Sequence, residues 1–172
     1  MQLKTVLLSI IMTLNLSALS VGEVPKNVVI TGDNGGLISG ETWNSSTIKD
    51  KVYVLFYVDP DEKGVNEHYS KALQAKKYRE KGAFGSMAII NLAATWKPNF
   101  VIEKILASKQ EEFPQTIYVK DKASVLVKEW EVVDDASNIL IFDKSGKLLF
   151  YKSGKMQEDD MKKSFEIIEA NL

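Results

Sequence analysis

The chain has 172 residues, of which 45% are hydrophobic, and its formal net charge is −1 at pH 7. This length and composition are typical of one globular domain with a sizeable core and exclude a disordered chain. The charge balance argues against nucleic-acid binding, which requires a basic surface.

The first twenty residues have the pattern of a signal peptide. Lys4 supplies a positive charge, Thr5 to Leu16 are mostly apolar, and Ala18 and Ser20 are small residues of the kind that a signal peptidase reads. We therefore expect export to the periplasm, cleavage near Ser20, and a single domain over residues 21–172 with no membrane contact after cleavage. An uncleaved anchor is the alternative, although the apolar run is shorter than the roughly 20 residues that span a bilayer.

The sequence contains no cysteine. Disulfides are stable in an oxidising compartment such as the periplasm, but this chain can form none. Catalysis by a thiolate of its own is excluded for the same reason.

The first half of the domain is predicted to begin with strands. Val28 to Ile30 and Leu37 to Ile38 flank the turn-forming segment Gly32 to Gly36, which favours an N-terminal β-hairpin. Val52 to Val58 consists of apolar β-formers and predicts a central strand buried on both faces. An acidic turn, Asp59 to Gly64, ends this strand.

Helices and strands then alternate along the chain. Apolar residues recur at helical spacing in residues 65–82, 98–106, 123–130 and 161–172. In the second of these segments Val101, Ile102, Ile105 and Leu106 are predicted to face inward, and in the third Trp130 is. Strands are predicted at 86–92, 116–119, 138–142 and 147–151, the last two joined by a turn at 143–146. This order predicts an α/β sandwich with a central mixed sheet flanked by helices. The Lys and Glu runs at 76–81 and 158–163 are typical of solvated helix faces.

Short motifs lie at the junctions of these elements. They are Thr42-Trp43-Asn44-Ser45, Ile48-Lys49-Asp50-Lys51-Val52, Phe113-Pro114, Phe142-Asp143-Lys144-Ser145-Gly146-Lys147 and Lys155-Met156-Gln157-Glu158-Asp159. In order and spacing they resemble the secreted thioredoxin-like relatives of thiol reductases and peroxiredoxins, and most of all the YtfJ family of periplasmic proteins. The resemblance runs from about Val24 to Leu172 and implies a thioredoxin-like three-layer sandwich.

The resemblance also implies where a redox centre would lie. Redox-active relatives carry Cys-x-x-Cys after the central strand, and here Asp61 to Gly64 occupies that position. They also place a cis-proline before the strand that corresponds to residues 138–142, and Ser137 is the best match to it. A cis bond before a residue other than proline costs about 2.5 to 4 kcal/mol, so we expect a trans peptide at Ser137. The resemblance therefore implies a fold retained after loss of its redox centre.

The acidic turn, its neighbours and two tryptophans form a candidate binding surface. Trp43 and Trp96 lie in predicted loops, where we expect exposed contacts. Asp61 and Glu62 are also residue types that stabilise a helix N-terminus, so a structural role is the alternative for both. The candidate residues are Asp59, Asp61, Glu62, Gly64, His68, Trp43, Trp96 and Ser137.

Acid-base or metal chemistry is an alternative use of the same residues. His68 is the only histidine and could act with a carboxylate of the turn in a hydrolase. The turn also resembles the start of a calcium loop, but Lys63 and Ser70 stand at the fifth and twelfth positions, where oxygen ligands are required. We expect neither a metal nor another cofactor.

Three functions remain after this reading. We favour a non-catalytic periplasmic module that binds a protein or peptide through the groove around residues 59–65 and 136–138, because a thioredoxin groove holds extended backbone without requiring thiols. A hydrolase or metal-dependent enzyme is the first alternative. A regulatory protein is the second, a label attached to some YtfJ-like proteins, although export and the acidic charge argue against direct contact with nucleic acid.

Overall fold

The computed structural model describes residues 19–172, so the predicted signal peptide lies outside the described residues except for Leu19 and Ser20. The domain is built on a six-stranded sheet with strand order β2-β6-β5-β4-β7-β8. Strand β5 is parallel to both β4 and β6, and the other neighbouring pairs are antiparallel. The strands are β2 (Gly35–Leu37), β4 (Val52–Val58), β5 (Phe84–Asn91), β6 (Thr116–Asp121), β7 (Ser137–Phe142) and β8 (Leu148–Ser153).

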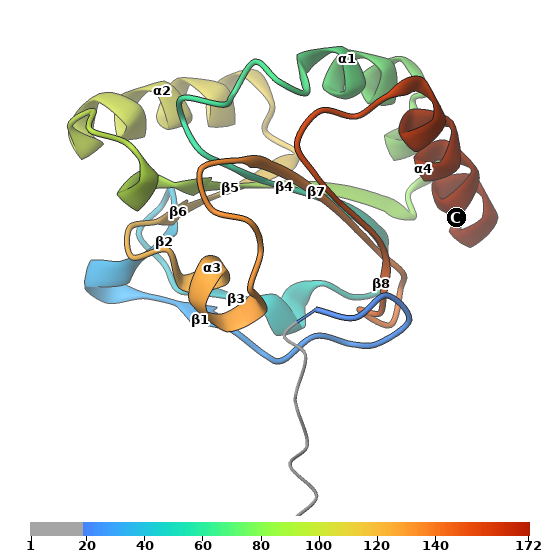
Figure 1. Ribbon diagram of the computed structural model, residues 1–172, viewed down its shortest axis with the longest axis horizontal. Coiled ribbons are helices and arrows are strands. Elements are labelled where there is room, and N and C mark those ends of the chain that lie inside the picture. The colour runs from blue at the N-terminus through green and yellow to red at the C-terminus, as the bar shows by residue number, and fades with distance from the viewer. Residues whose placement is uncertain (1–18) are drawn as a thin grey trace, which may run out of the picture.

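Helices cover both faces of this sheet, as Figure 1 shows. Helices α1, α2 and α4 lie on one face, and α3 lies on the other together with the short strands β1 and β3. The predicted sandwich with a central mixed sheet is confirmed. The remaining elements are α1 (Glu67–Ala75), α2 (Asn99–Glu112), α3 (Val125–Trp130), α4 (Glu158–Asn171), β1 (Val29–Ile30), β3 (Trp43–Asn44), and the 3-10 turns η1 (Gly32–Asn34), η2 (Ser45–Thr47), η3 (Tyr78–Lys81) and η4 (Leu92–Ala94). None of the helices within residues 19–172 is both long and apolar enough to cross a membrane.

Strand β4 is central and is buried on both faces, as its composition predicts. Val52 and Val54 pack against Tyr69 of α1 on the helical face. Leu55 and Tyr57 belong to the core cluster on the opposite face, which contains the inward-facing Trp130 of α3. Burying one such side chain contributes about 1.5 to 3 kcal/mol, so each of the buried side chains of this strand adds to the stability of the core on its own face. Because side chains pack on both faces of β4, the carboxyl end of this strand has a fixed position, and the acidic turn begins there.

The N-terminal ribbon differs from the predicted hairpin in its pairing. A small antiparallel sheet is present, but β1 pairs with β3 rather than with the Leu37 segment. The glycine segment instead forms β2 and pairs with β6. Gly35 has a φ of +118°, and a Cβ there would lie 1.9 Å from the carbonyl oxygen of Lys120. Glycine therefore permits a close approach of two strands at this point, a use that turn statistics do not anticipate.

Helix α2 buries a narrower stripe than predicted. Ile102 and Leu106 are buried, but Val101 and Ile105 are 38% and 47% exposed, so their predicted inward orientation is wrong. The two buried residues are four apart and pack over Ile90 and Tyr118 near the edge of the sheet. A helix in that position has only one row of side chains in contact with the sheet.

Candidate functional site

The acidic turn begins directly at the end of β4. The Asp59 backbone N–H donates to the carbonyl oxygen of Ala136 (3.0 Å), which fixes the turn against the segment before β7. The Asp59 side chain accepts from the backbone N–H of Asp61 (2.8 Å), and the N–H of Glu62 donates to the Asp59 carbonyl (3.0 Å). This is an Asx turn, in which an aspartate reverses the chain through its own oxygens.

A buried asparagine connects the elements around the expected redox position. Asn66 precedes α1 and is 4% exposed. Its Nδ2 donates to Ser137 Oγ and to the Gly154 carbonyl, both at 2.9 Å, and its Oδ1 accepts from the Met156 backbone N–H at 2.8 Å. We call these four residues the Asn66 bridge. The bridge joins the start of α1 to β7 and to the segment between β8 and α4, which are remote in sequence.

The predicted site residues divide into a buried and an exposed group. Trp43, Asp59 and Ser137 are 2%, 5% and 2% exposed, so they cannot form part of an open binding surface. The peptide bond before Ser137 is trans, as predicted. Glu62 is half-buried, and the exposed residues are Asp61, Gly64, His68 and Trp96.

Trp43 belongs to the core, and its predicted exposure is wrong. It lies on β3 rather than in a loop, and its ring meets that of Trp130 edge to face with centroids 6.5 Å apart. The surrounding polar residues Thr42 and Asn44 suggest an open loop in the sequence, but the two-stranded ribbon places Trp43 against α3. Burial of this large ring is thus a consequence of a pairing that the sequence does not reveal.

His68 is not joined to the acidic turn. Its Nε2 lies 2.8 Å from the carbonyl oxygen of Met156, a bond in which the ring nitrogen donates. Within residues 19–172, no group of three or more His, Asp or Glu side chains could hold a metal ion. The geometry therefore provides no support for the hydrolase or the calcium alternative.

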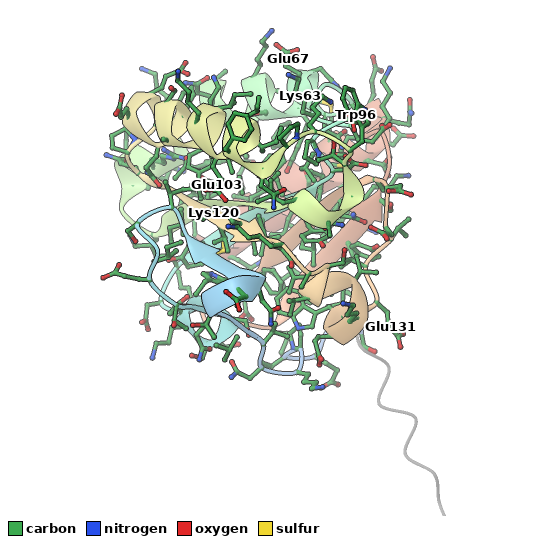
Figure 2. The ribbon with its side chains drawn as sticks, turned by 90° about the vertical axis from the view of Figure 1, so that its left-hand side faces the viewer. Lys63, Glu67, Trp96, Glu103, Lys120 and Glu131 are labelled. Carbon is green, nitrogen blue, oxygen red and sulfur yellow. The ribbon has the colours of Figure 1, made fainter. Side chains whose placement is uncertain are left out.

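The exposed part of the site is a surface shared by the acidic turn and the segment after β5. Thr95 Oγ1 donates to Asp61 Oδ2 (2.7 Å), and Lys97 forms an ion pair with the same carboxylate. Between them Trp96 is 86% exposed, and Phe100 at the start of α2 is 74% exposed. We call Asp61, Trp96, Lys97 and Phe100 the Trp96 surface. Figure 2 shows Trp96 on the same helical side of the sheet as Lys63 and Glu67.

The carboxyl of Asp59 is buried close to other acidic residues of the site. Burial, and then the negative charges of Asp135 and Glu62, raise the pKa of its carboxyl above the ordinary value of 3.8. A carboxyl whose pKa is raised by folding stabilises the fold when it is protonated, and this contribution is lost as the pH rises through the folded-state pKa. At neutral pH the ionised carboxylate of Asp59 is therefore destabilising.

Asp59→Asn should remove this pH-dependent penalty. Asparagine keeps the oxygen that accepts from Asp61 but has no charge. We expect the stability of the variant relative to wild type to increase as the pH rises from 3.8 through the folded-state pKa, and then to level off. Urea unfolding of both proteins at acidic and neutral pH measures the difference. An offset between them that is the same at every pH would contradict the assignment.

Sequence reasoning missed a pocket on the helical face of the sheet. It has a volume of about 500 Å³ and contains Arg79 of η3, together with Ser86 and Thr116 of the sheet. The charged run at 76–81 predicts a solvated position for Arg79, but the side chain is half-buried, and burial lowers the pKa of its guanidinium. One signal was available, since Arg79 is the only arginine among the 22 lysines and arginines of the chain. We call this site the Arg79 pocket.

The strand order and the flanking helices are those of a thioredoxin-like fold, and the sequence has no cysteine for a Cys-x-x-Cys motif at the end of β4. Three solved structures illustrate the likeness. They are the thioredoxin domain of a thiol-disulfide oxidoreductase from Bacteroides vulgatus (TM-score 0.60, 12% identity, covering 87% of this chain and 97% of that one), a peroxiredoxin-like protein from Aquifex aeolicus (0.58, 16%, 87% and 88%), and the exposed lipoprotein thioredoxin of Streptococcus pneumoniae (0.55, 14%, 83% and 99%). At these identities the similarity shows the fold alone.

The sequence places the chain within a narrower group. Residues 16–171 match the family described as "Bacterial protein of unknown function (YtfJ_HI0045)", and the chain belongs to this family. The resemblance seen in the junction motifs is thereby confirmed. The curated proteins compared with the chain include no match.

Proposed function

We propose that the protein is exported to the periplasm and acts there as a non-catalytic module that binds a protein or peptide partner at the Trp96 surface. The observation that carries the proposal is the exposure of two large aromatic residues, Trp96 at 86% and Phe100 at 74%, beside the position of the lost redox centre. Exposed aromatic patches mark interaction sites, and tryptophan is among the residues that contribute most to binding. Export is supported by the signal-peptide pattern before Ser20.

The contacts around Trp96 explain how the surface is held ready for a partner. The bonds from Thr95 and Lys97 to Asp61 fix the backbone on both sides of the tryptophan. The Nζ atom of Lys97 lies 5.9 Å from the centre of the Trp96 ring, which favours one side of the indole. A preorganised aromatic side chain loses little conformational entropy on binding.

The partner is bound by side chains rather than by strand pairing at the start of β7. In a thioredoxin groove, extended peptides pair with main-chain groups near the redox centre. Here the Ala136 carbonyl already accepts from the Asp59 N–H, and Ser137 is enclosed in the Asn66 bridge. Redox transfer by this chain's own thiols is excluded because the sequence contains no cysteine.

Trp96→Ala should reduce recovery of a periplasmic partner at least tenfold. A residue central to an interface contributes about 2 kcal/mol or more, and about 1.4 kcal/mol corresponds to a factor of ten in affinity. The measurement is quantitative affinity capture from periplasmic extract, with the purified protein as bait. Asp61→Ala should have a smaller effect, because it loosens the loop and leaves the indole in place.

Val24→Ala is the matched control for the Trp96 variant. Val24 is also apolar and is 61% exposed. The N-terminal segment to which it belongs, blue in Figure 1, lies on the face of the sheet opposite α1 and α2. This variant should recover the partner as well as wild type does. Equal recovery by wild type and Trp96→Ala, or equal loss in both variants, would refute the proposed surface.

A further inference from the structure

The Arg79 pocket exists because two helices cover separate parts of the same face of the sheet. Helix α1 packs through Tyr69 and Leu73 on the cluster around Val54. Helix α2 packs through Ile102 and Leu106 on a different cluster, near the edge of the sheet. Between them, β5 presents Ser86 and Ala88 to the pocket. Since these side chains are small, they do not fill the space that the helices leave open.

Arg79 provides an unpaired cation inside this pocket. A single guanidinium nitrogen, Nη2, donates both to Ser86 and to Thr116, the latter at 2.6 Å. A guanidinium has five N–H donors. Within residues 19–172, the N–H groups on Nε and Nη1 of Arg79 have no hydrogen-bond partner. In the same part of the chain, Arg79 forms no ion pair, whereas neighbouring Lys76 and Lys77 are paired with Glu169 and Glu80.

The rest of the pocket is largely apolar and is the size of a small-molecule site. Its lining includes Phe56 and Val58 of β4, Ile90 of β5, Tyr118 of β6 and Leu73 of α1. Ligand sites typically have volumes of about 300 to 1,000 Å³ and combine an apolar lining with a few fixed polar groups, which describes this pocket of about 500 Å³. From Ser86 to Ile90 the floor extends about 13 Å along the strand, at about 3.3 Å per residue.

We propose that the Arg79 pocket binds a small amphipathic carboxylate, such as a medium-chain fatty acid. The carboxylate pairs with the free N–H groups of Arg79, and the apolar chain lies along β5 beside α1. The Arg79 pocket lies beneath α1 and contains no residue of the Trp96 surface. Ligand binding in this pocket is therefore a separate proposal from partner binding at the Trp96 surface, and the two can be tested independently.

The charges at the pocket favour a monoanion over a phosphate or another dianion. Lys63, Lys77 and Arg79 line the pocket, but Lys77 is paired with Glu80 and Lys63 is exposed, so Arg79 is the cation that is fixed at the floor. Its guanidinium matches the planar geometry of one carboxylate with two parallel hydrogen bonds. Glu67 and Glu80 also line the pocket, and each is paired with a lysine, Lys71 and Lys77. Because each of these carboxylates already has a lysine partner, neither competes for Arg79, whose single charge matches a single charge on the ligand.

Isothermal titration calorimetry of the purified protein with decanoate tests the proposal. Decanol has the same chain without the charge, and acetate has the charge without the chain. We expect decanoate to bind at least tenfold more tightly than either, because both the apolar floor and Arg79 are needed. Binding of decanoate that is absent, or no tighter than that of decanol, would overturn the inference.

Two variants assign the binding to this pocket. Arg79→Gln should weaken decanoate binding at least tenfold and leave decanol binding unchanged. Ala88→Leu should weaken both ligands, because it fills the floor while Arg79 remains in place. Lys104→Gln, which removes an exposed charge of α2 outside the pocket, is the control and should bind decanoate as wild type does. Undiminished decanoate binding by Ala88→Leu, or equal loss in all three variants, would show that decanoate binds elsewhere and refute the assignment.

Discussion

Asp121→Ala should lower the free energy of unfolding by about 2 to 5 kcal/mol, since loss of a helix cap costs about 0.5 to 2 kcal/mol and a buried hydroxyl donor left without its acceptor costs about 1 to 3 kcal/mol more. Asp121 ends β6 and is fully buried. One of its carboxylate oxygens accepts from the backbone N–H groups of Ala123 (3.2 Å) and Val125 (2.8 Å). The other accepts from the Leu126 N–H and from the Tyr57 hydroxyl, both at 3.1 Å.

The loss is large because Asp121 is the N-terminal cap of α3. Ser124 precedes the helix but makes no capping bond with its side chain. Without Asp121, the first N–H groups of α3 and the O–H donor of the buried Tyr57 would lose their acceptor away from water. Helix α3 carries Trp130, which closes the core on that face of the sheet. Loss of the cap therefore destabilises a whole layer of the fold.

Chemical denaturation of the purified variants measures this effect. Asp121→Asn keeps one acceptor oxygen and should lose less stability than Asp121→Ala. Asp33→Ala removes an exposed carboxylate near β2 and should change stability by less than about 0.5 kcal/mol. An Asp121→Ala variant that is as stable as Asp33→Ala would show that the cap is not needed.

Asn66→Ala should lower the free energy of unfolding by about 2 to 4 kcal/mol, because it removes the partner of two buried polar groups and one half-buried one. Those groups are the Ser137 hydroxyl, the Gly154 carbonyl and the Met156 N–H. The bridge joins α1 to the segment that leads into α4. We therefore also expect faster hydrogen exchange at the Met156 amide, which donates to Asn66 in the folded protein.

Asn99→Ala is the matched control for the bridge. Asn99 is exposed at the start of α2, and its replacement should change stability by less than about 0.5 kcal/mol. If Asn66→Ala unfolds at the same denaturant concentration as Asn99→Ala, the bridge contributes nothing to stability and the expected loss is refuted.

Local sequence patterns predicted the fold well where one pattern has one structural solution. The apolar run Val52–Val58 could only be a strand buried on both faces, and it is the centre of the sheet. The turn at Asp143 joins β7 and β8 as predicted, with the Asp143 side chain accepting from the Ser145 and Lys147 N–H groups (2.8 and 3.0 Å). Strand pairs that are remote in sequence were harder to predict. In the N-terminal ribbon, β1 was expected to pair with the Leu37 segment but pairs with β3.

The candidate site was predicted in position but not in composition. The acidic turn lies at the end of β4, and Trp96 is exposed as expected. Trp43 and Ser137 are buried, because their exposure depends on which elements pack over them. Asn66, Asp121 and Arg79 were missed for the same reason, since their partners come from elements far away in the sequence.

By itself, the sequence determined the chemistry that this protein lacks and the order of its elements. The absence of cysteine and the periodicity of apolar residues are properties of the chain and do not depend on how it packs. Only the tertiary structure decided which polar residues are enclosed and which side chains share a pocket. Asn66 and Asp121 bridge separate elements, and Arg79 enters a pocket lined by four strands, by α1 and by η3. Such contacts arise from packing between distant segments, and no local pattern encodes them.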